Sequence, residues 1–299
     1  MSDKIIKIKG RPLEKLVQVI KKGLGSSVTK SELRKEEEFD EGSFDNSKDL
    51  HPDSRVQERI IHKETKRQQN LDYINYIAGE QLNQDENVSD EPVDDDWIYR
   101  FFNIAEDISN EEMQLLWGRI LAGEIKEPSS YSTRTLELLK NLTKEEAEIF
   151  TKFAQLKITS GDTSFIYNQD NGKFLEDEFG IKFSDRLLLT ELGLIASENN
   201  LEFSFNPTGN VQMNHVLRYG RKGIVLYREQ NTPKQAIKVL IFTKAGLELS
   251  RLIQPEFSLK YIRNICKGFK HSNVKIEYGD LILSPNNRFL LLNKTIFNE

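Results

Sequence analysis

The sequence predicts an α+β protein in which an all-helical bundle is followed by a smaller winged-helix-like α+β domain. Between residues 53 and 158, apolar residues recur with helical spacing, and capping residues stand before the runs. After about Lys157 the pattern changes to short β-branched segments punctuated by glycines. Such a change of period usually marks a domain boundary, which places the second domain at residues 159–299.

The charge of the chain is unevenly distributed. The 299 residues carry a net charge of −5, but residues 1–160 alone have a net charge of −8. Residues 210–275 hold 13 basic residues against 3 acidic ones. A segment of this kind attracts polyanions or the acidic half of the same chain, and both remain open. No stretch resembles a membrane helix or a signal peptide, so a cytoplasmic location is expected.

The N-terminal 52 residues are expected to form an amphipathic helix and a mobile linker. Residues 12–24 place their leucines on one helical face, with Pro12 near the start. We expect this helix to dock on a core, and peripheral membrane contact through Leu13 to Leu24 is the alternative. Residues 25–52 are polar without apolar periodicity, which is typical of a linker.

Several helix starts can be read from capping residues. A long helix with a basic first half is expected from Asp53 or Ser54 to about Leu82. The acidic cluster Asp94 to Asp96 is interpreted as helix caps rather than as metal ligands. Capping boxes predict two further helix starts, with a helix from Ser132 to Asn141 between them. These boxes are Ser109 with Glu112 and Thr143 with Glu146.

The C-terminal domain is expected to mix strands with helices. The expected strands are 164–168, 201–205, 215–219, 223–227, 237–242, 274–278 and 289–292. The expected helices are 184–197, 243–253 and 258–270. Gly220 to Lys222 connects two of these strands, which indicates a hairpin.

No familiar catalytic motif is present. The phosphate loop, the nucleophile elbow and the zinc-protease helix are all missing from the sequence. The four histidines and the lone Cys266 lack metal-ligand spacing, so neither a metal nor a cofactor is expected. Cys266 is interpreted as a buried apolar residue rather than as a nucleophile. The chain is therefore expected to be non-enzymatic, with an enzyme as the open alternative.

Polar residues of the helical domain form one candidate site. Glu124 and Arg134 flank the Pro128 loop, where they would form an anion site or a structural salt bridge. The structural salt bridge is the favoured interpretation. The full candidate set is Glu124, Arg134, Ser132 and Arg119.

The basic segment forms the second candidate site. Two phrases, L-x-x-x-G-L-I before this segment and F-T-x-x-G within it, resemble those of winged-helix domains. They consist of Leu189, Gly193, Leu194, Ile195, Phe242, Thr243 and Gly246. The resemblance implies phosphate contacts at a wing tip. The residues expected to contact nucleic acid are Arg218, Arg221, Lys222 and Arg228.

A family resemblance rests on three phrases in the helical domain. They are D-W-I-x-R-F-F at 96–102, M-Q-x-L-W-x-x-I-L-A-G-E-I at 113–125 and S-x-R-T-L-E-L-L-K-N-L at 132–142. These phrases resemble an uncharacterised bacterial family, the domain of unknown function numbered twenty-eight zero six, over about the first 155 residues. The family implies no activity. The helix phrase L-W-x-x-I-L-A-G-E-I at 116–125 is also similar to abortive-infection alpha proteins, which implies a setting in phage defence.

We therefore expect a regulatory or interaction protein. Its helical domain would assemble with itself or with a protein partner, and its basic domain would recognise a protein or a nucleic acid. The alternative is a phage-defence effector or enzyme with a site at Asp96, Glu124, Ser132 and Arg134.

Overall fold

The computed structural model describes residues 11–25, 52–83, 88–198, 200–284, 286 and 288–298. They divide into two compact units between Lys140 and Asn141. Almost all of the predicted linker lies outside the described residues. Among the described residues, no helix is both long and apolar enough to cross a bilayer. The predicted cytoplasmic location stays a prediction.

The described part of the first unit consists of helices. They are α1 (Arg11–Leu24), α2 (Pro52–Leu82), α3 (Asp95–Ala105), α4 (Glu111–Lys126) and α5 (Thr133–Lys140). Asp94 caps α3 by accepting a hydrogen bond from the backbone N–H of Trp97 at 2.9 Å, as predicted. The predicted cap of α4 is wrong by one residue, because the side chain of Asn110 caps the helix. Ser109 accepts a hydrogen bond from Asn70 instead.

Helix α1 packs on the other helices of this unit, including α2, α3 and α4. Its inward face consists of Leu13, Leu16, Val19 and Ile20, which are all buried. This packing leaves the helix without the exposed apolar face that membrane contact requires. The Nζ of Lys15 further fixes α1 by donating to the carbonyl oxygens of Ser89 and Ile125, at 3.1 and 3.0 Å.

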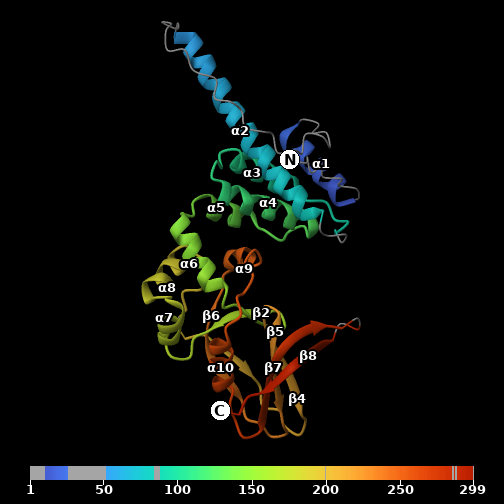
Figure 1. Ribbon diagram of the computed structural model, residues 1–299, viewed down its shortest axis with the longest axis vertical. Coiled ribbons are helices and arrows are strands. Elements are labelled where there is room, and N and C mark those ends of the chain that lie inside the picture. Colours follow the sequence, from blue (N-terminus) through green and yellow to red (C-terminus); the bar gives the residue numbers. More distant parts are fainter. Residues whose placement is uncertain are drawn as a thin grey trace, which may run out of the picture. The chain divides into compact units, whose positions relative to one another are not determined.

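The two tryptophans lie in the core of the first unit. Phe101 stacks on Trp97 and lies 5.3 Å from Trp117 between ring centroids. Gly118 allows α4 to approach α2 closely, because a Cβ atom there would lie 2.5 Å from Ile77. The first half of α2 reaches beyond the other helices of the unit and is mostly exposed (Figure 1).

The second unit combines helices with a sheet. Its helices are α6 (Lys144–Ala154), α7 (Lys173–Phe179), α8 (Phe183–Glu191), α9 (Lys244–Ser250) and α10 (Leu259–Gly268). Its strands are β1 (Ile158–Ser160), β2 (Thr163–Tyr167), β3 (Glu202–Phe205), β4 (Met213–Tyr219), β5 (Lys222–Arg228), β6 (Gln235–Ile241), β7 (Val274–Leu283) and β8 (Phe289–Ile296).

Helix α6 belongs to this second unit, although the sequence placed it in the helical bundle. The predicted capping box is present, since Thr143 and Glu146 bond each other's backbone N–H groups. Phe150 and Phe153 of α6 pack on Phe242, which ties the helix to the sheet unit. A capping box indicates where a helix begins but not which core the helix packs against. The sequence alone therefore assigned α6 to the other domain.

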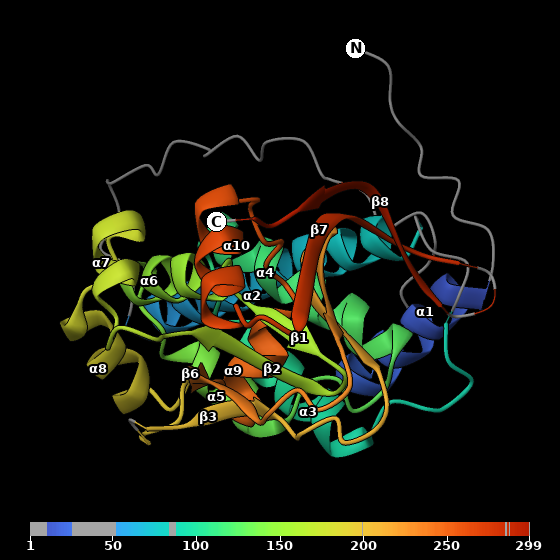
Figure 2. The ribbon, with the colours of Figure 1, turned by 90° about the horizontal axis from the view of Figure 1, so that it is seen from below.

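In the described residues, eight strands form one sheet with antiparallel neighbours in the order β3-β6-β2-β1-β4-β5-β7-β8. The mixed α+β class is therefore confirmed. Helix α10 lies against the sheet (Figure 2). Its Tyr261 contacts Tyr219 and accepts a hydrogen bond from the backbone N–H of Tyr167. The long hairpin of β7 and β8 forms one edge (Figure 1).

The β1–β4 junction joins the two halves of this sheet. Thr159 of β1 pairs with Ser164 of β2 on one side and with Arg218 of β4 on the other. Residues directly opposite each other in antiparallel strands project from the same face. The register therefore places these three side chains in one row across the junction, which we call the seam.

The two phrases noted in the sequence meet in space. The helix predicted at 184–197 ends at Glu191, and Ile195 forms a β-bridge with Phe242. Thr243 caps α9 and donates its hydroxyl to the carbonyl of Gly193. A Cβ atom at Gly246 would lie 1.9 Å from the carbonyl oxygen of Leu194. Glycine is thus required at position 246, because the first turn of α9 packs directly against the backbone of Leu194.

Replacing Gly246 by alanine is expected to destabilise the second unit. The new methyl group overlaps backbone that cannot move aside like a side chain, so we expect a loss of about 2 to 3 kcal/mol. Urea denaturation followed by circular dichroism measures this loss. The control is Lys173→Ala, at an exposed position on α7. Equal stability of the two variants would contradict the close contact.

Candidate functional site

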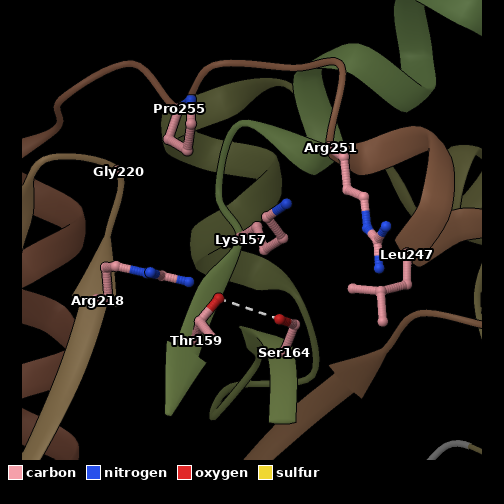
Figure 3. A pocket seen from close by; sticks show the side chains of 8 residues that line it. All are labelled: Lys157, Thr159, Ser164, Arg218, Gly220, Leu247, Arg251 and Pro255. Atoms are coloured by element: carbon pink, nitrogen blue, oxygen red, sulfur yellow. Dashed lines mark hydrogen bonds between the residues drawn. The ribbon is translucent and has the colours of Figure 1, made fainter. Parts of the chain in front are cut away.

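A cavity of about 290 Å³ opens at the seam. Eight residues line it, namely Lys157, Thr159, Ser164, Arg218, Gly220, Leu247, Arg251 and Pro255. We call it the seam pocket. Figure 3 shows Lys157 between Arg218 on one side and Arg251 on the other, with the Thr159 and Ser164 hydroxyls below. None of the lining residues is acidic, so three cations face the cavity without a carboxylate among them.

Lys157 occupies the short connection between α6 and β1. Its backbone N–H still bonds Ala154 at the end of the helix, and its side chain lies two residues before Thr159, toward the same face. The Nζ donates to the carbonyl oxygen and to the Oγ of Ser250, at 3.0 and 2.9 Å. An ammonium group has a further proton beyond these two bonds, which is available to a ligand.

The pKa of Lys157 is shifted strongly. Burial, together with the positive charges of Arg218 and Arg251, lowers this pKa from 10.5 to about 8. Both arginines are exposed, and among the described residues neither of them forms an ion pair. An anion in the pocket would therefore meet uncompensated positive charge.

The rim of the pocket is held by the turn after β4. Gly220 has φ of +57° and begins the two-residue connection to β5. A Cβ atom there would lie 3.3 Å from Pro255, so glycine lets the loop after α9 approach the turn. Tyr219 donates its hydroxyl to the carbonyl of Glu256, which fixes that loop further.

The hairpin residues predicted for nucleic-acid contact have different environments. Arg218 lines the seam pocket, and Arg221 is exposed at the tip of the turn. Lys222 is held by Asp280 at 2.6 Å and lies over the ring of Phe257.

Arg228 requires a correction, because its side chain is fully buried rather than available at the surface. Its guanidinium donates to the side chain of Gln235 and to the carbonyl oxygens of Asn206 and Pro233, all within 2.9 Å. These bonds replace the water that a buried charge loses. Arg228 therefore joins three segments of the unit and does not contact an external phosphate.

The polar residues predicted in the helical unit differ in burial. The Glu124 carboxylate is buried and accepts hydrogen bonds from the backbone N–H groups of Ser129 and Tyr131, at 2.6 and 2.9 Å. Arg134 and Arg119 are exposed, whereas the Glu124 side chain is buried. Ser129 has φ of +69°, a conformation that a local hydrogen bond helps to hold. Glu124 thus fixes the loop through its backbone.

Of the three cations that line the pocket, Lys157 and Arg251 were missed by the sequence analysis. Lys157 stands between Leu156 and Ile158, which are both buried. A lysine between two buried apolar residues at a helix–strand junction is the one local signal of its role. Arg251 carries no such signal, because its place in the pocket depends on long-range packing of α9.

The other chemical groups offer little to a catalytic site. Cys266 is buried in α10, and burial raises the pKa of its thiol to about 12. Within the described ranges, no group of three His, Cys, Asp or Glu residues is placed to hold a metal ion.

The second unit thus has an α+β fold with a cationic pocket where β1 pairs with β4. A family model described as "Protein of unknown function (DUF2806)" matches residues 54–266. Because this match spans more than two thirds of the chain, the protein belongs to that family. The predicted extent is wrong, since the match continues past residue 155 into the second unit. No curated protein and no solved structure matches the chain.

The pKa of Lys157 predicts a pH-dependent stability. Between pH 8 and 10.5 the unfolded chain binds more protons than the folded one, so wild-type stability rises with pH relative to Lys157→Met. Urea denaturation of both proteins at about pH 7 and about pH 10 measures the change in their difference. Titrating tyrosines affect both proteins alike and cancel. A difference that stays constant would show that the lysine titrates normally.

The loop role of Glu124 predicts an unequal effect of two alanine substitutions. Glu124→Ala leaves the buried N–H of Tyr131 and the part-buried N–H of Ser129 without their acceptor, which is expected to lower the free energy of unfolding by about 2 to 4 kcal/mol. Arg134→Ala changes an exposed side chain and is expected to stay within about 0.5 kcal/mol of wild type. Thermal and urea denaturation distinguish the two. Equal losses would instead support the salt bridge expected from the sequence.

Proposed function

We propose that this protein is a non-enzymatic recognition protein whose second unit binds nucleic acid through the cations around the seam pocket. The observation that supports nucleic-acid binding is the set of Lys157, Arg218 and Arg251 around a cavity without a lining carboxylate. Phosphates are the anions that such sets of basic residues neutralise. Arg221, exposed at the adjacent turn, extends the positive charge toward a following phosphate.

The topology of the second unit supports this proposal. Strands β2, β6 and β3 pair in that order, with α6 before them and with α7 and α8 between β2 and β3. This order is similar to that of a winged-helix arrangement, with the β4–β5 hairpin inserted where a wing would lie. The likeness is one of fold and carries no function by itself.

Helix α8, which would read DNA in such an arrangement, is unsuited to that role. It exposes Phe183 and Leu187 and carries Asp185 and Glu191, which would repel phosphates. The proposed contact therefore uses the pocket and the hairpin turn rather than a recognition helix. Contacts of this kind are made to the phosphates of the nucleic acid and do not distinguish base sequences.

The helical unit is proposed to assemble with a second copy or with a protein partner. The first half of α2 exposes Val56, Ile60 and Ile61, the kind of apolar surface that contact with another chain would bury. The alternative of a phage-defence effector with a site at Asp96, Glu124, Ser132 and Arg134 gains no support from the geometry. None of these four residues lines the seam pocket.

The proposal predicts nucleic-acid binding that weakens steeply with salt. Fluorescence anisotropy with labelled single-stranded and duplex DNA over a salt series measures the slope of log K against log salt. Arg251→Ala is expected to weaken binding and to flatten the slope by about one, because one phosphate contact is lost.

The matched control is Arg134→Ala, which removes an exposed arginine from the helical unit. It is expected to leave both the affinity and the slope unchanged. If the wild-type protein binds neither DNA at about 50 mM salt, the proposed function is wrong.

A further inference from the structure

The dimensions of the seam pocket restrict what it can hold. Its volume of about 290 Å³ lies at the lower end of the range for small-molecule sites. The Gly220–Pro255 approach and the bond from Tyr219 to Glu256 close it beside the turn. A continuous strand of nucleotides does not fit in such a volume, whereas one phosphate and part of its sugar do.

The charge in the pocket also exceeds that of an internal phosphate. A phosphodiester has one negative charge, whereas a terminal phosphate monoester has a second ionisation near pH 6 and approaches a double charge above it. Three cations face the cavity. A dianion neutralises more of their mutual repulsion than a diester does.

The donors are suited to several oxygens on one phosphorus atom. Lys157 retains a proton beyond its two bonds to Ser250, and both guanidinium groups present several N–H donors. The Thr159 and Ser164 hydroxyls bond each other at 3.0 Å, and one O–H of the pair remains free to donate. A terminal phosphate monoester has one more non-bridging acceptor oxygen than a phosphodiester.

We propose that the seam pocket receives the terminal phosphate monoester of a nucleic acid, an inference that rests on the proposed function. The protein then distinguishes a phosphorylated strand end from a hydroxyl end. Arg221 lies outside the pocket and contacts the following backbone phosphates.

The test compares oligonucleotides of identical sequence that carry a 5′-phosphate, a 3′-phosphate or hydroxyls at both ends. Wild-type protein is expected to bind one of the phosphorylated strands at least about tenfold more tightly than the hydroxyl strand, as charge-assisted hydrogen bonds imply. Inorganic phosphate added as a competitor is expected to abolish this preference and to leave the remaining binding intact.

Three variants assign the preference to the pocket. Arg251→Gln and Lys157→Met are expected to abolish the tenfold preference, and circular dichroism checks that both variants are folded. Arg221→Gln is the matched control, because it removes an exposed arginine that does not line the pocket. It is expected to weaken binding to all the strands equally and to preserve the preference.

The pH dependence supplies an independent readout. The groups facing the Lys157 ammonium are Arg218 from β4, Arg251 after α9, and the hydroxyls of Thr159, Ser164 and Ser250. Because Lys157 loses its proton above about pH 8, the end preference is expected to fall between about pH 7 and about pH 9. In Arg251→Gln it is expected to be absent throughout.

The outcomes separate the two proposals. Equal binding of phosphorylated and hydroxyl strands would overturn the inference and leave the proposed function standing. A preference that survives both pocket substitutions would also overturn it. Failure of every strand to bind would overturn the proposed function itself.

Discussion

The pairing of β1 with β4 is the constraint on which the candidate site depends. Through this register, Ser164, Thr159 and Arg218 stand side by side on one face of the sheet. A slip of one residue would turn Arg218 to the opposite face. This pairing is a long-range contact, because two helices and β3 lie between β2 and β4. Thr159 and Ser164 therefore come to lie beside Arg218 only when β1 has paired with β4.

The electrostatics of the seam favour a bound anion over an empty pocket. Lys157 is brought out of water between two arginines, and its lowered pKa expresses the resulting unfavourable free energy. The aromatic contacts of α6 with Phe242 and the bonds to Ser250 hold the lysine there despite this repulsion. Unfavourable desolvation and charge repulsion at a polar cavity are typical of binding sites, where a ligand supplies the opposite charge.

Local signals in the sequence predicted local structure well. Asp94 and the pair of Thr143 with Glu146 begin helices as expected, and the glycine-containing turn at Gly220 connects a hairpin. Local errors are small, such as the cap of α4 that lies at Asn110 instead of Ser109, and the larger errors concern long-range contacts. Arg228 is buried because its guanidinium bonds segments that are distant in sequence, and nothing adjacent to it indicates that burial. The seam pocket was missed for the same reason, since its residues come from separate strands and from the end of α9.

Diffraction tests most directly whether the seam forms one anion site. Tungstate is a tetrahedral dianion with a strong anomalous signal and stands in for a phosphate monoester. Crystals grown with tungstate are expected to show an anomalous peak within hydrogen-bond distance of Lys157 Nζ and both guanidinium groups. An empty pocket in such crystals, with the Lys157, Arg218 and Arg251 side chains in the positions described, would contradict the account.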